Sequence, residues 1–297
     1  FAEGAAAYFE GHWARARVLL ERAEEIFRDR CAGVTWEIMA ARMLLFAALQ
    51  HMGQIATMAK RIPLIVDEAE LRGDLFAGTL FRVWHATAVW MAADNPERAL
   101  RNINEAIGQF SKQSFYVQHC MALLGRSQIY LYAARAQDSL RILEAEWSKL
   151  ADYYFLKLQN VRIEAIYLRC LALIGTAHGE PKKKSGLLAQ AERWAAEIQN
   201  ESMRWSTPLA AMIRAGVADH RGEATAAAEE YQAAIDGFKA AGMPLREAVA
   251  QIRLGEVLGG AEGRRLVQTG LGRMTEQGIK NPLRFSLALA PILSKYD

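Results

Sequence analysis

Histidine and cysteine are the residues of this chain most able to do chemistry, and their spacing argues against a metal or redox site. No two histidines stand four residues apart, the spacing that brings two imidazoles to one helix face around zinc. The cysteines are odd in number and far apart, which predicts buried thiols in a reducing cytoplasm rather than a disulfide framework. The residues are His12, His51, His85, His119, His178 and His220, with Cys31, Cys120 and Cys170.

Catalytic motifs are incomplete as well. Segment 125–129, Gly-Arg-Ser-Gln-Ile, lacks the closing glycine and the preceding strand of a nucleophile elbow. Segment 220–222, His-Arg-Gly, lacks the aspartate that accepts the proton in a kinase catalytic loop. A phosphate-binding loop of the form Gly-x-x-x-x-Gly-Lys-(Ser/Thr) does not occur. We therefore expect no catalytic, cofactor-binding or metal-binding residue, and a chain that is not an enzyme.

The numbers of basic and acidic residues, and the length of the apolar runs, indicate which kinds of partner the chain could bind. Lys and Arg together number 36 against 33 Asp and Glu, a formal net charge of +3. This near balance gives no basic footprint for nucleic acid. The longest apolar run, 38–49, is interrupted by Arg42 and falls short of the ~18 residues that a membrane span needs. We expect neither a nucleic-acid partner nor a membrane partner.

Turn residues recur at steps of 37 to 44 residues, and this recurrence predicts the architecture. Each step has room for two helices and a turn, which is typical of an α-solenoid. The prediction is an all-α fold, a right-handed α-α superhelix of about seven helix pairs over residues 1–280, closed by a capping helix over 281–297. The turn residues are Gly11, Gly53, Asp94, Arg135, Gly179, Gly222 and Gly259.

Proline placement supports the same division. A residue that caps a helix followed by proline at its first position predicts a helix start, because proline has no N–H to leave unpaired there. Asn95-Pro96, Thr207-Pro208 and Asn281-Pro282 fit this pattern, and Pro244 starts a further helix. Pro181 falls in a linker. Pro63 and Pro291 interrupt helical patterns, so we expect a kink or break at each.

A small-large-small pattern on the second helix of several pairs resembles the tetratricopeptide (TPR) repeat. Offsets of four and seven residues put the three members on one helix face, where alanines let a neighbouring helix approach closely. The steps average near 41 residues rather than the 34 of a standard repeat, which indicates longer helices. The copies are Ala16, Leu20, Ala23; Ala99, Ile103, Ala106; and Ala227, Tyr231, Ala234.

The C-terminal segment 274–285, with Leu289-Ala290-Pro291, resembles the tail of large bacterial multidomain signalling proteins. Those proteins join a serine/threonine kinase or cyclase domain and an AAA-type or STAND-type ATPase to a TPR-like array. The chain also begins at Phe1 inside an apparent helix, as a piece of a longer polypeptide would. The resemblance implies a cytoplasmic regulatory module that binds a protein or peptide partner, or the upstream domains of its own chain, and regulates an upstream kinase or ATPase.

In TPR arrays the first helix of each pair lines the concave groove, so polar residues there are candidates for partner binding. Lys157, Asn160 and Glu164 fall within about 60° of one another on a helix predicted over 154–174, at 100° per residue. An ordinary solvated stripe is the alternative. Four further candidates come from residue types that anchor interfaces, with burial in the core as the alternative: Trp84, His85, Arg204 and Trp205.

Two other functions stay open. Exposed terminal helices, or a groove that accepts another copy's tail, would make the array a homo-oligomerisation scaffold. A small-molecule sensor would need a closed apolar pocket with convergent polar groups, and the sequence shows no convergent cluster of titratable residues.

Overall fold

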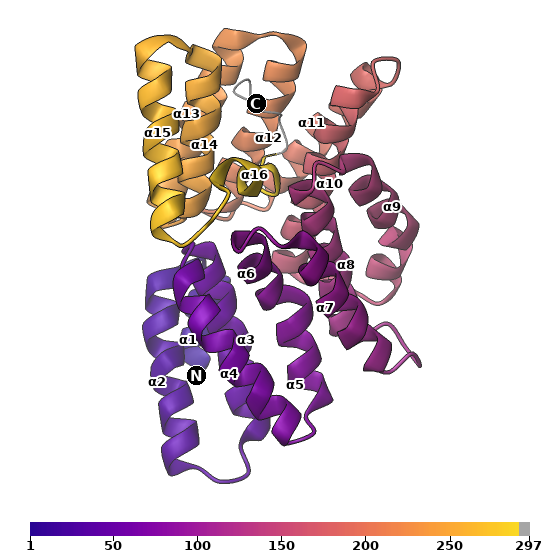
Figure 1. Ribbon diagram of the computed structural model, residues 1–297, viewed down its shortest axis with the longest axis vertical. Coiled ribbons are helices and arrows are strands. Elements are labelled where there is room, and N and C mark those ends of the chain that lie inside the picture. Colours follow the sequence, from indigo (N-terminus) through magenta and orange to yellow (C-terminus); the bar gives the residue numbers. More distant parts are fainter. Residues whose placement is uncertain (291–297) are drawn as a thin grey trace.

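The computed structural model describes residues 1–290, and its regular elements in this range are all helical (Figure 1). The fold is an all-α solenoid, as predicted, and the described residues form seven consecutive helix pairs followed by a short helix. None of these helices combines the length and apolar character that crossing a membrane requires. The helices are α1 (Ala2–Phe9), α2 (Trp13–Arg30), α3 (Thr35–His51), α4 (Ile55–Leu71), α5 (Leu75–Leu80), the π-helical turn η1 (Phe81–His85), α6 (Ala86–Ala92), α7 (Pro96–Gln109), α8 (Val117–Tyr132), α9 (Ala136–Asp152), the 3₁₀ turn η2 (Phe155–Lys157), α10 (Gln159–Gly179), α11 (Lys184–Asn200), α12 (Ser206–Arg221), α13 (Ala224–Ala240), α14 (Pro244–Leu258), α15 (Gly260–Glu276) and α16 (Pro282–Leu287).

The small-large-small faces are buried between neighbouring helices. In α13, Ala227, Tyr231 and Ala234 are all fully buried, and the matching triads of α2 and α7 are at most 5% exposed. Most helices pack mainly against their neighbours along the chain, as in other repeat arrays. The sequence pattern therefore predicts correctly which face each of these helices buries.

The turn residues at the repeat period lie where each pair changes direction. Five of the seven have positive φ, including Gly53 at 66° and Asp94 at 54°, a conformation that favours glycine and tolerates aspartate. In the fourth pair the positive φ falls on Ala134, one residue before the predicted position. Gly179 ends α10 without a left-handed residue.

Most proline predictions are confirmed. Asn95 and Asn281 cap α7 and α16 by accepting the backbone N–H groups of Arg98 and Arg284, and α14 begins at Pro244. The predicted cap at Thr207 is wrong, because α12 begins at Ser206, two residues before Pro208. Pro63 lies on the exposed face of α4, which continues through it from Ile55 to Leu71. Pro291 lies outside the described residues.

The third pair has an irregular first helix. Between α5 and α6 the backbone forms the π-helical turn η1, and the Asn102 amide donates to the carbonyl of Arg82 at 2.9 Å. Helix α8 approaches closely here: a Cβ on Gly125 would lie 2.5 Å from the carbonyl oxygen of Val83. Turns of this kind are frequent at functional sites, and this one carries Trp84.

The array curves through about one circuit, so that its last pairs return to its first. In Figure 1 the helices α1 to α6 lie below, α8 to α11 at the right, and α12 to α15 above the first helices. The Trp205 ring lies 5.8 Å from the Trp13 ring and 5.4 Å from the His51 ring. We call this junction the seam. It comprises Gly11, Trp13, His51 and Gly53 from the first pairs against Trp205 and Leu245 from the last ones.

The C-terminal segment crosses the inside of the circuit. The backbone N–H of Lys280 donates to the carbonyl of Ala92, and Asn281 and Arg284 both donate to the Asp94 carboxylate. Helix α16 packs against α6 and α8 as well as α15. Thus the described part of the predicted capping segment 281–297 lies on the inner wall and links the last pair to the third and fourth pairs. Residues 291–297 lie outside the described range.

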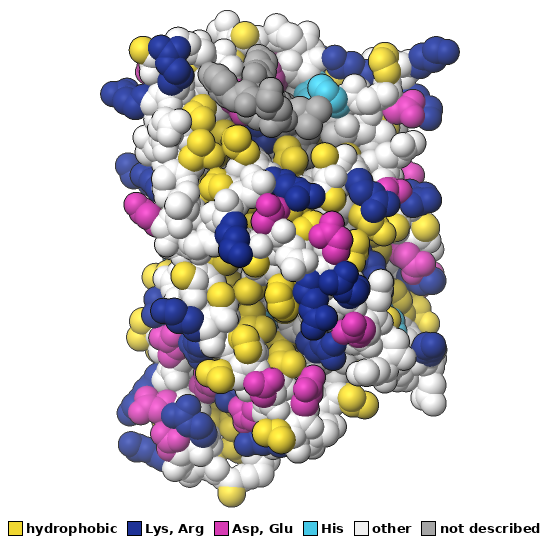
Figure 2. All heavy atoms as spheres, in the orientation of Figure 1, with side chains coloured by type: hydrophobic (Ala, Val, Ile, Leu, Met, Phe, Trp, Pro, Cys, Tyr) yellow, Lys and Arg dark blue, Asp and Glu magenta, His cyan; other side chains and the backbone are white. Residues whose placement is uncertain are grey.

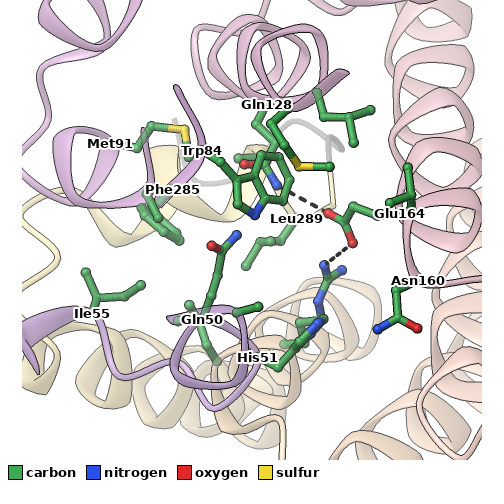
Figure 3. A pocket seen from close by; sticks show the side chains of 18 of the residues that line it. Gln50, His51, Ile55, Trp84, Met91, Gln128, Asn160, Glu164, Phe285 and Leu289 are labelled. Atoms are coloured by element: carbon green, nitrogen blue, oxygen red, sulfur yellow. Dashed lines mark hydrogen bonds and ion pairs between the residues drawn. The ribbon is translucent and has the colours of Figure 1, made fainter. Parts of the chain in front are cut away.

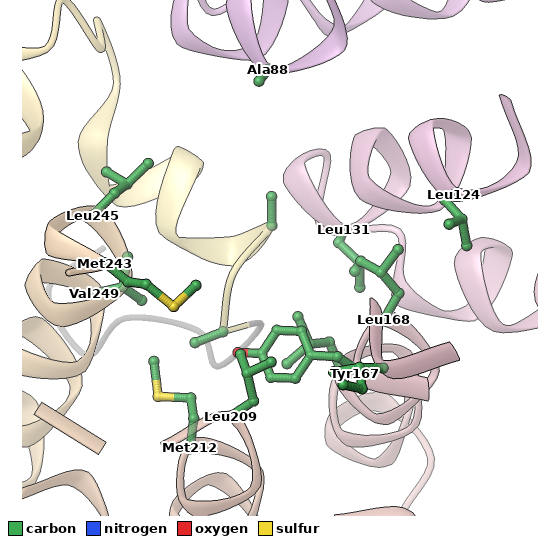
Figure 4. Close-up of a cluster of buried hydrophobic side chains, with 14 of the residues drawn as sticks. Ala88, Leu124, Leu131, Tyr167, Leu168, Leu209, Met212, Met243, Leu245 and Val249 are labelled. Atoms are coloured by element: carbon green, nitrogen blue, oxygen red, sulfur yellow. The ribbon is translucent and has the colours of Figure 1, made fainter. Parts of the chain in front are cut away.

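The hydrophobic core runs through all seven pairs, and part of it lies on the inner side of this circuit. Figure 4 shows Met243, Leu245 and Val249 facing Leu131 and Leu168 across the interior, with the Tyr167 ring between them. On the face in Figure 2, hydrophobic side chains gather in the middle, while acidic and basic side chains are interspersed around them.

Candidate functional site

A cavity of about 120 Å³ lies at the centre of the circuit, and we call it the central chamber (Figure 3). Its volume is several times the ~10–15 Å³ that one water molecule needs. Helix α3, turn η1, α6, α8, α10, α14 and the α16 segment all contribute to its wall. Residues from the first, middle and last pairs thus meet at one site.

One side of the central chamber is apolar. Figure 3 shows Ile55, Met91 and Phe285 on the side opposite Glu164 and Asn160, with Trp84 and Gln50 between them. Further apolar wall comes from Ala47, Ala88, Met121, Leu124, Leu245 and Leu289. An apolar cavity with a few convergent polar groups is the usual form of a small-molecule site.

A buried ion pair forms the polar side. Glu164 on α10 accepts hydrogen bonds from Arg246 on α14 and from Gln128 on α8, each at 3.3 Å. Glu164 and Arg246 are both only 8% exposed, and the Arg246 guanidinium also lies 4.7 Å from the centre of the Tyr167 ring. Three helices from separate pairs are therefore joined through one carboxylate.

Three buried polar atoms of the central chamber have no hydrogen-bond partner among the described residues. They are Nη1 of Arg246, Nδ2 of Asn160 and Oε1 of Gln50. Asn160 and Arg246 also lie close enough to the hydroxyls of Tyr8 and Tyr167 to offset part of the rise in the pKa of each. A buried polar atom without a partner costs about 1–3 kcal/mol. All three belong to side chains that line the central chamber, so two donors and one acceptor stand next to a space that could hold a ligand.

The other titratable groups of the wall are held uncharged. Burial, with a smaller contribution from Arg246, lowers the pKa of His51 from 6.5 to about 3. Burial raises the pKa of Tyr8 to about 12. At neutral pH the charges of the central chamber are thus those of Glu164 and Arg246, which balance each other.

The structure brings together three of the seven residues selected from the sequence. Asn160, Glu164 and Trp84 line the central chamber. Lys157 is exposed in η2, because α10 begins at Gln159 rather than at Tyr154 as predicted. His85 points elsewhere, into an aromatic cluster with Phe81 at 5.2 Å and Phe46 at 5.8 Å, and burial lowers its pKa to about 3.

Of the remaining two residues, Trp205 belongs to the seam and Arg204 lies beside it. Trp205 is 1% exposed. Arg204 is exposed and donates to the backbone carbonyl of Ala240 at 2.8 Å. A wider and more open hollow of about 440 Å³ lies beside them, lined largely by turn residues.

Sequence reasoning missed Gln50, Gln128 and Arg246. Each is a polar residue inside a helical stretch rich in apolar residues, the same signal that pointed to Asn160 and Glu164. Their convergence, however, depends on the curvature of the whole array.

No protein-family model, no characterised protein and no solved structure shows significant similarity to this chain. The residues of the site themselves are therefore the basis for inferring its function.

Proposed function

We propose that the chain is a non-catalytic sensor module that binds a small molecule in the central chamber and, through it, controls how firmly the two ends of the array are held together. The observation that carries this proposal is the composition of the wall, to which α3, α10, α14 and α16 all contribute. A ligand that touches all of them favours the closed circuit.

The energetics of a solenoid support this coupling. Its stability resides mainly in contacts between neighbouring repeats, whereas the seam joins the first pairs to the last ones and the Glu164–Arg246 pair joins the fifth pair to the seventh. A ligand that binds the closed form better than an open form shifts the population by its difference in affinity. Closure is thus the property that binding would change.

The protonation states fit binding better than catalysis. A general base is most effective with a pKa near the working pH, and the pKa of His51 is lowered to about 3. Glu164 is engaged by both Arg246 and Gln128.

The resemblance of the tail to bacterial signalling proteins supports a proposal about the larger protein in which this module acts. We propose a cytoplasmic module of a larger bacterial protein whose closure is sensed by an upstream kinase or ATPase domain. The odd number and wide spacing of the cysteines favour a reducing compartment. Cys120 and Cys170 are buried as predicted, but the prediction is wrong for Cys31, which is exposed where α2 ends.

A second candidate function is the binding of a peptide or protein partner along the inner wall. The observation that favours it is the way the chain's own tail is held there, through its main chain. The Tyr167 hydroxyl donates to the carbonyl of Leu289 at 2.7 Å, and Arg253 donates to the carbonyl of Ala290 at 2.9 Å. Such contacts do not depend on the side chains of the bound segment, so a partner's segment could compete for them. Exchange of tails between two copies would give the homo-oligomer considered above.

A pair of matched variants tests the sensor proposal. Ala47→Leu fills the central chamber from α3, and Ala196→Leu makes the same change on an exposed position of α11. A library of small fragments is screened by ligand-observed NMR, with circular dichroism to confirm folding. We expect fragments that bind the wild type and Ala196→Leu but not Ala47→Leu. The proposal is wrong if no fragment binds, or if the fragments that bind do not distinguish the two variants.

A further inference from the structure

We infer that the ligand of the central chamber is an uncharged molecule with a hydrogen-bond acceptor and a donor at one end, as in a primary carboxamide, and an apolar body at the other. This inference rests on the proposed function and specifies its ligand. Three properties of the wall carry it: the unpaired polar atoms, the charge balance and the separation of polar from apolar groups.

The unpaired atoms define the polar end. Arg246 Nη1 and Asn160 Nδ2 are donors and require an acceptor, whereas Gln50 Oε1 is an acceptor and requires a donor. A carboxamide supplies both: its oxygen accepts from Arg246 or Asn160, and its N–H donates to Gln50. A ketone or an ether would leave the Gln50 oxygen unpaired, at a cost comparable to a lost hydrogen bond.

The charge balance excludes ions. Glu164 and Arg246 compensate each other at 8% exposure, and the shifted pKa values of His51 and Tyr8 keep both neutral. A ligand carboxylate or ammonium would therefore add a buried charge without a counterion, which costs several kcal/mol. An uncharged ligand avoids this cost.

The apolar body follows from the opposite wall. Ile55, Met91 and Phe285 face the space away from Glu164 (Figure 3). Methionine side chains adapt to the shape of what they contact. The Trp84 ring, held by turn η1, adds an aromatic surface for a flat ligand.

A series of isosteric probes tests the ligand class. Benzamide is uncharged, benzoate is its anionic counterpart, benzylamine supplies a cation, and acetophenone keeps the acceptor but lacks the donor. Dissociation constants are measured by NMR titration on the full chain. We expect benzamide to bind the wild type at least about tenfold more tightly than each of the others. Equal or tighter binding of benzoate or benzylamine would overturn the inference.

Two variants test why benzamide should be preferred. Glu164→Gln keeps the shape but leaves Arg246 unbalanced, so we expect the preference to switch from benzamide to benzoate. Gln50→Leu removes the unpaired acceptor, so benzamide should lose about fivefold or more in affinity while acetophenone is unchanged. An unchanged preference in Glu164→Gln contradicts the charge argument. If Glu164→Gln fails to fold, Gln50→Leu alone tests the inference. Equal losses of affinity for benzamide and acetophenone in Gln50→Leu would overturn it.

Failure of this inference is distinguishable from failure of the proposed function. If library fragments of another class bind and Ala47→Leu abolishes their binding, the central chamber is a ligand site and only the ligand class is wrong. If no compound binds, or Ala47→Leu has no effect, the proposed function itself is wrong.

Discussion

Substitution of Gly53 tests whether closure of the circuit contributes to stability, because the chain offers a matched control at Gly73. Both glycines have φ of 66°, and each backbone N–H donates to the carbonyl three residues earlier at 3.1 Å. The two turns differ only in their surroundings. A Cβ on Gly53 would lie 2.7 Å from Cβ of Leu245 across the seam, whereas a Cβ on Gly73 meets nothing within 4 Å.

The expected loss in the free energy of unfolding has two contributions, one from the backbone and one from packing. Alanine at positive φ costs about 1–2 kcal/mol, offset by about 0.4–1 kcal/mol from the lower entropy of the unfolded chain. Gly73→Ala should therefore cost about 1 kcal/mol. Gly53→Ala carries the same backbone cost plus overpacking of about 1–3 kcal/mol, because carbon atoms normally stay ~3.5–4.0 Å apart. We expect a total loss of about 2–4 kcal/mol for Gly53→Ala.

Urea unfolding followed by tryptophan fluorescence measures both losses. A double-mutant cycle with Leu245→Gly, which removes the opposing Cβ, should recover about 1–3 kcal/mol of the loss at Gly53. Benzamide affinity is a second measure, since Leu245 lines the central chamber. Gly53→Ala should weaken benzamide binding, and Gly73→Ala should not. Equal losses of stability in Gly53→Ala and Gly73→Ala would refute this reasoning and would mean that contacts across the seam do not contribute measurably to stability.

Three further predictions concern protonation, the tail and the thiols. Burial lowers the pKa of His85 from 6.5 to about 3, so between these values the unfolded chain binds a proton that the folded chain does not. The free energy of unfolding should therefore decrease as the pH is lowered from 7 to 5, and His85 should account for about 2 kcal/mol of this decrease. Urea titrations at the two pH values measure the decrease, which should be about 2 kcal/mol smaller in His85→Leu. Asp94→Gly removes the carboxylate that anchors Asn281 and Arg284 without straining the backbone. It should speed hydrogen exchange at Lys280 by about tenfold, and unchanged exchange would count against the anchor. Native protein should show one fast thiol with Ellman's reagent, the exposed Cys31, because burial raises the pKa of both Cys120 and Cys170.

Local signals in the sequence account for the pairs but not for their closure. A proline after a capping asparagine, or a glycine at a turn, acts within a few residues of itself, and these signals predict the helix boundaries at Asn95 and Asn281 correctly. Gly11 and Gly53 were selected as turn markers alone. The structure shows that both also permit close approach across the seam, where a Cβ on Gly11 would lie 2.8 Å from the Trp205 ring.

The central chamber was only partly predictable for a similar reason. Asn160 and Glu164 stand four residues apart on one helix, so their common face follows from helical periodicity. Gln50 and Arg246 are separated by 196 residues, and their meeting depends on small rotations summed over several pairs. Lys157 was misplaced because the chain takes a 3₁₀ turn with Tyr154 at φ of 63°, which delays the start of α10.

The Glu164–Arg246 pair helps to fix the register of the seventh pair against the fifth, and through it the way in which the circuit closes. A buried ion pair gains little net stability, because the cost of removing two charges from water offsets their attraction. Removing only one partner is far worse, since it leaves a buried charge uncompensated. A shift of α14 by one helical turn relative to α10 would do the same by parting the two charges. The pair thus penalises a misaligned register more than it stabilises the correct one. It also leaves Nη1 of Arg246, a residue that lines the central chamber, without a hydrogen-bond partner among the described residues.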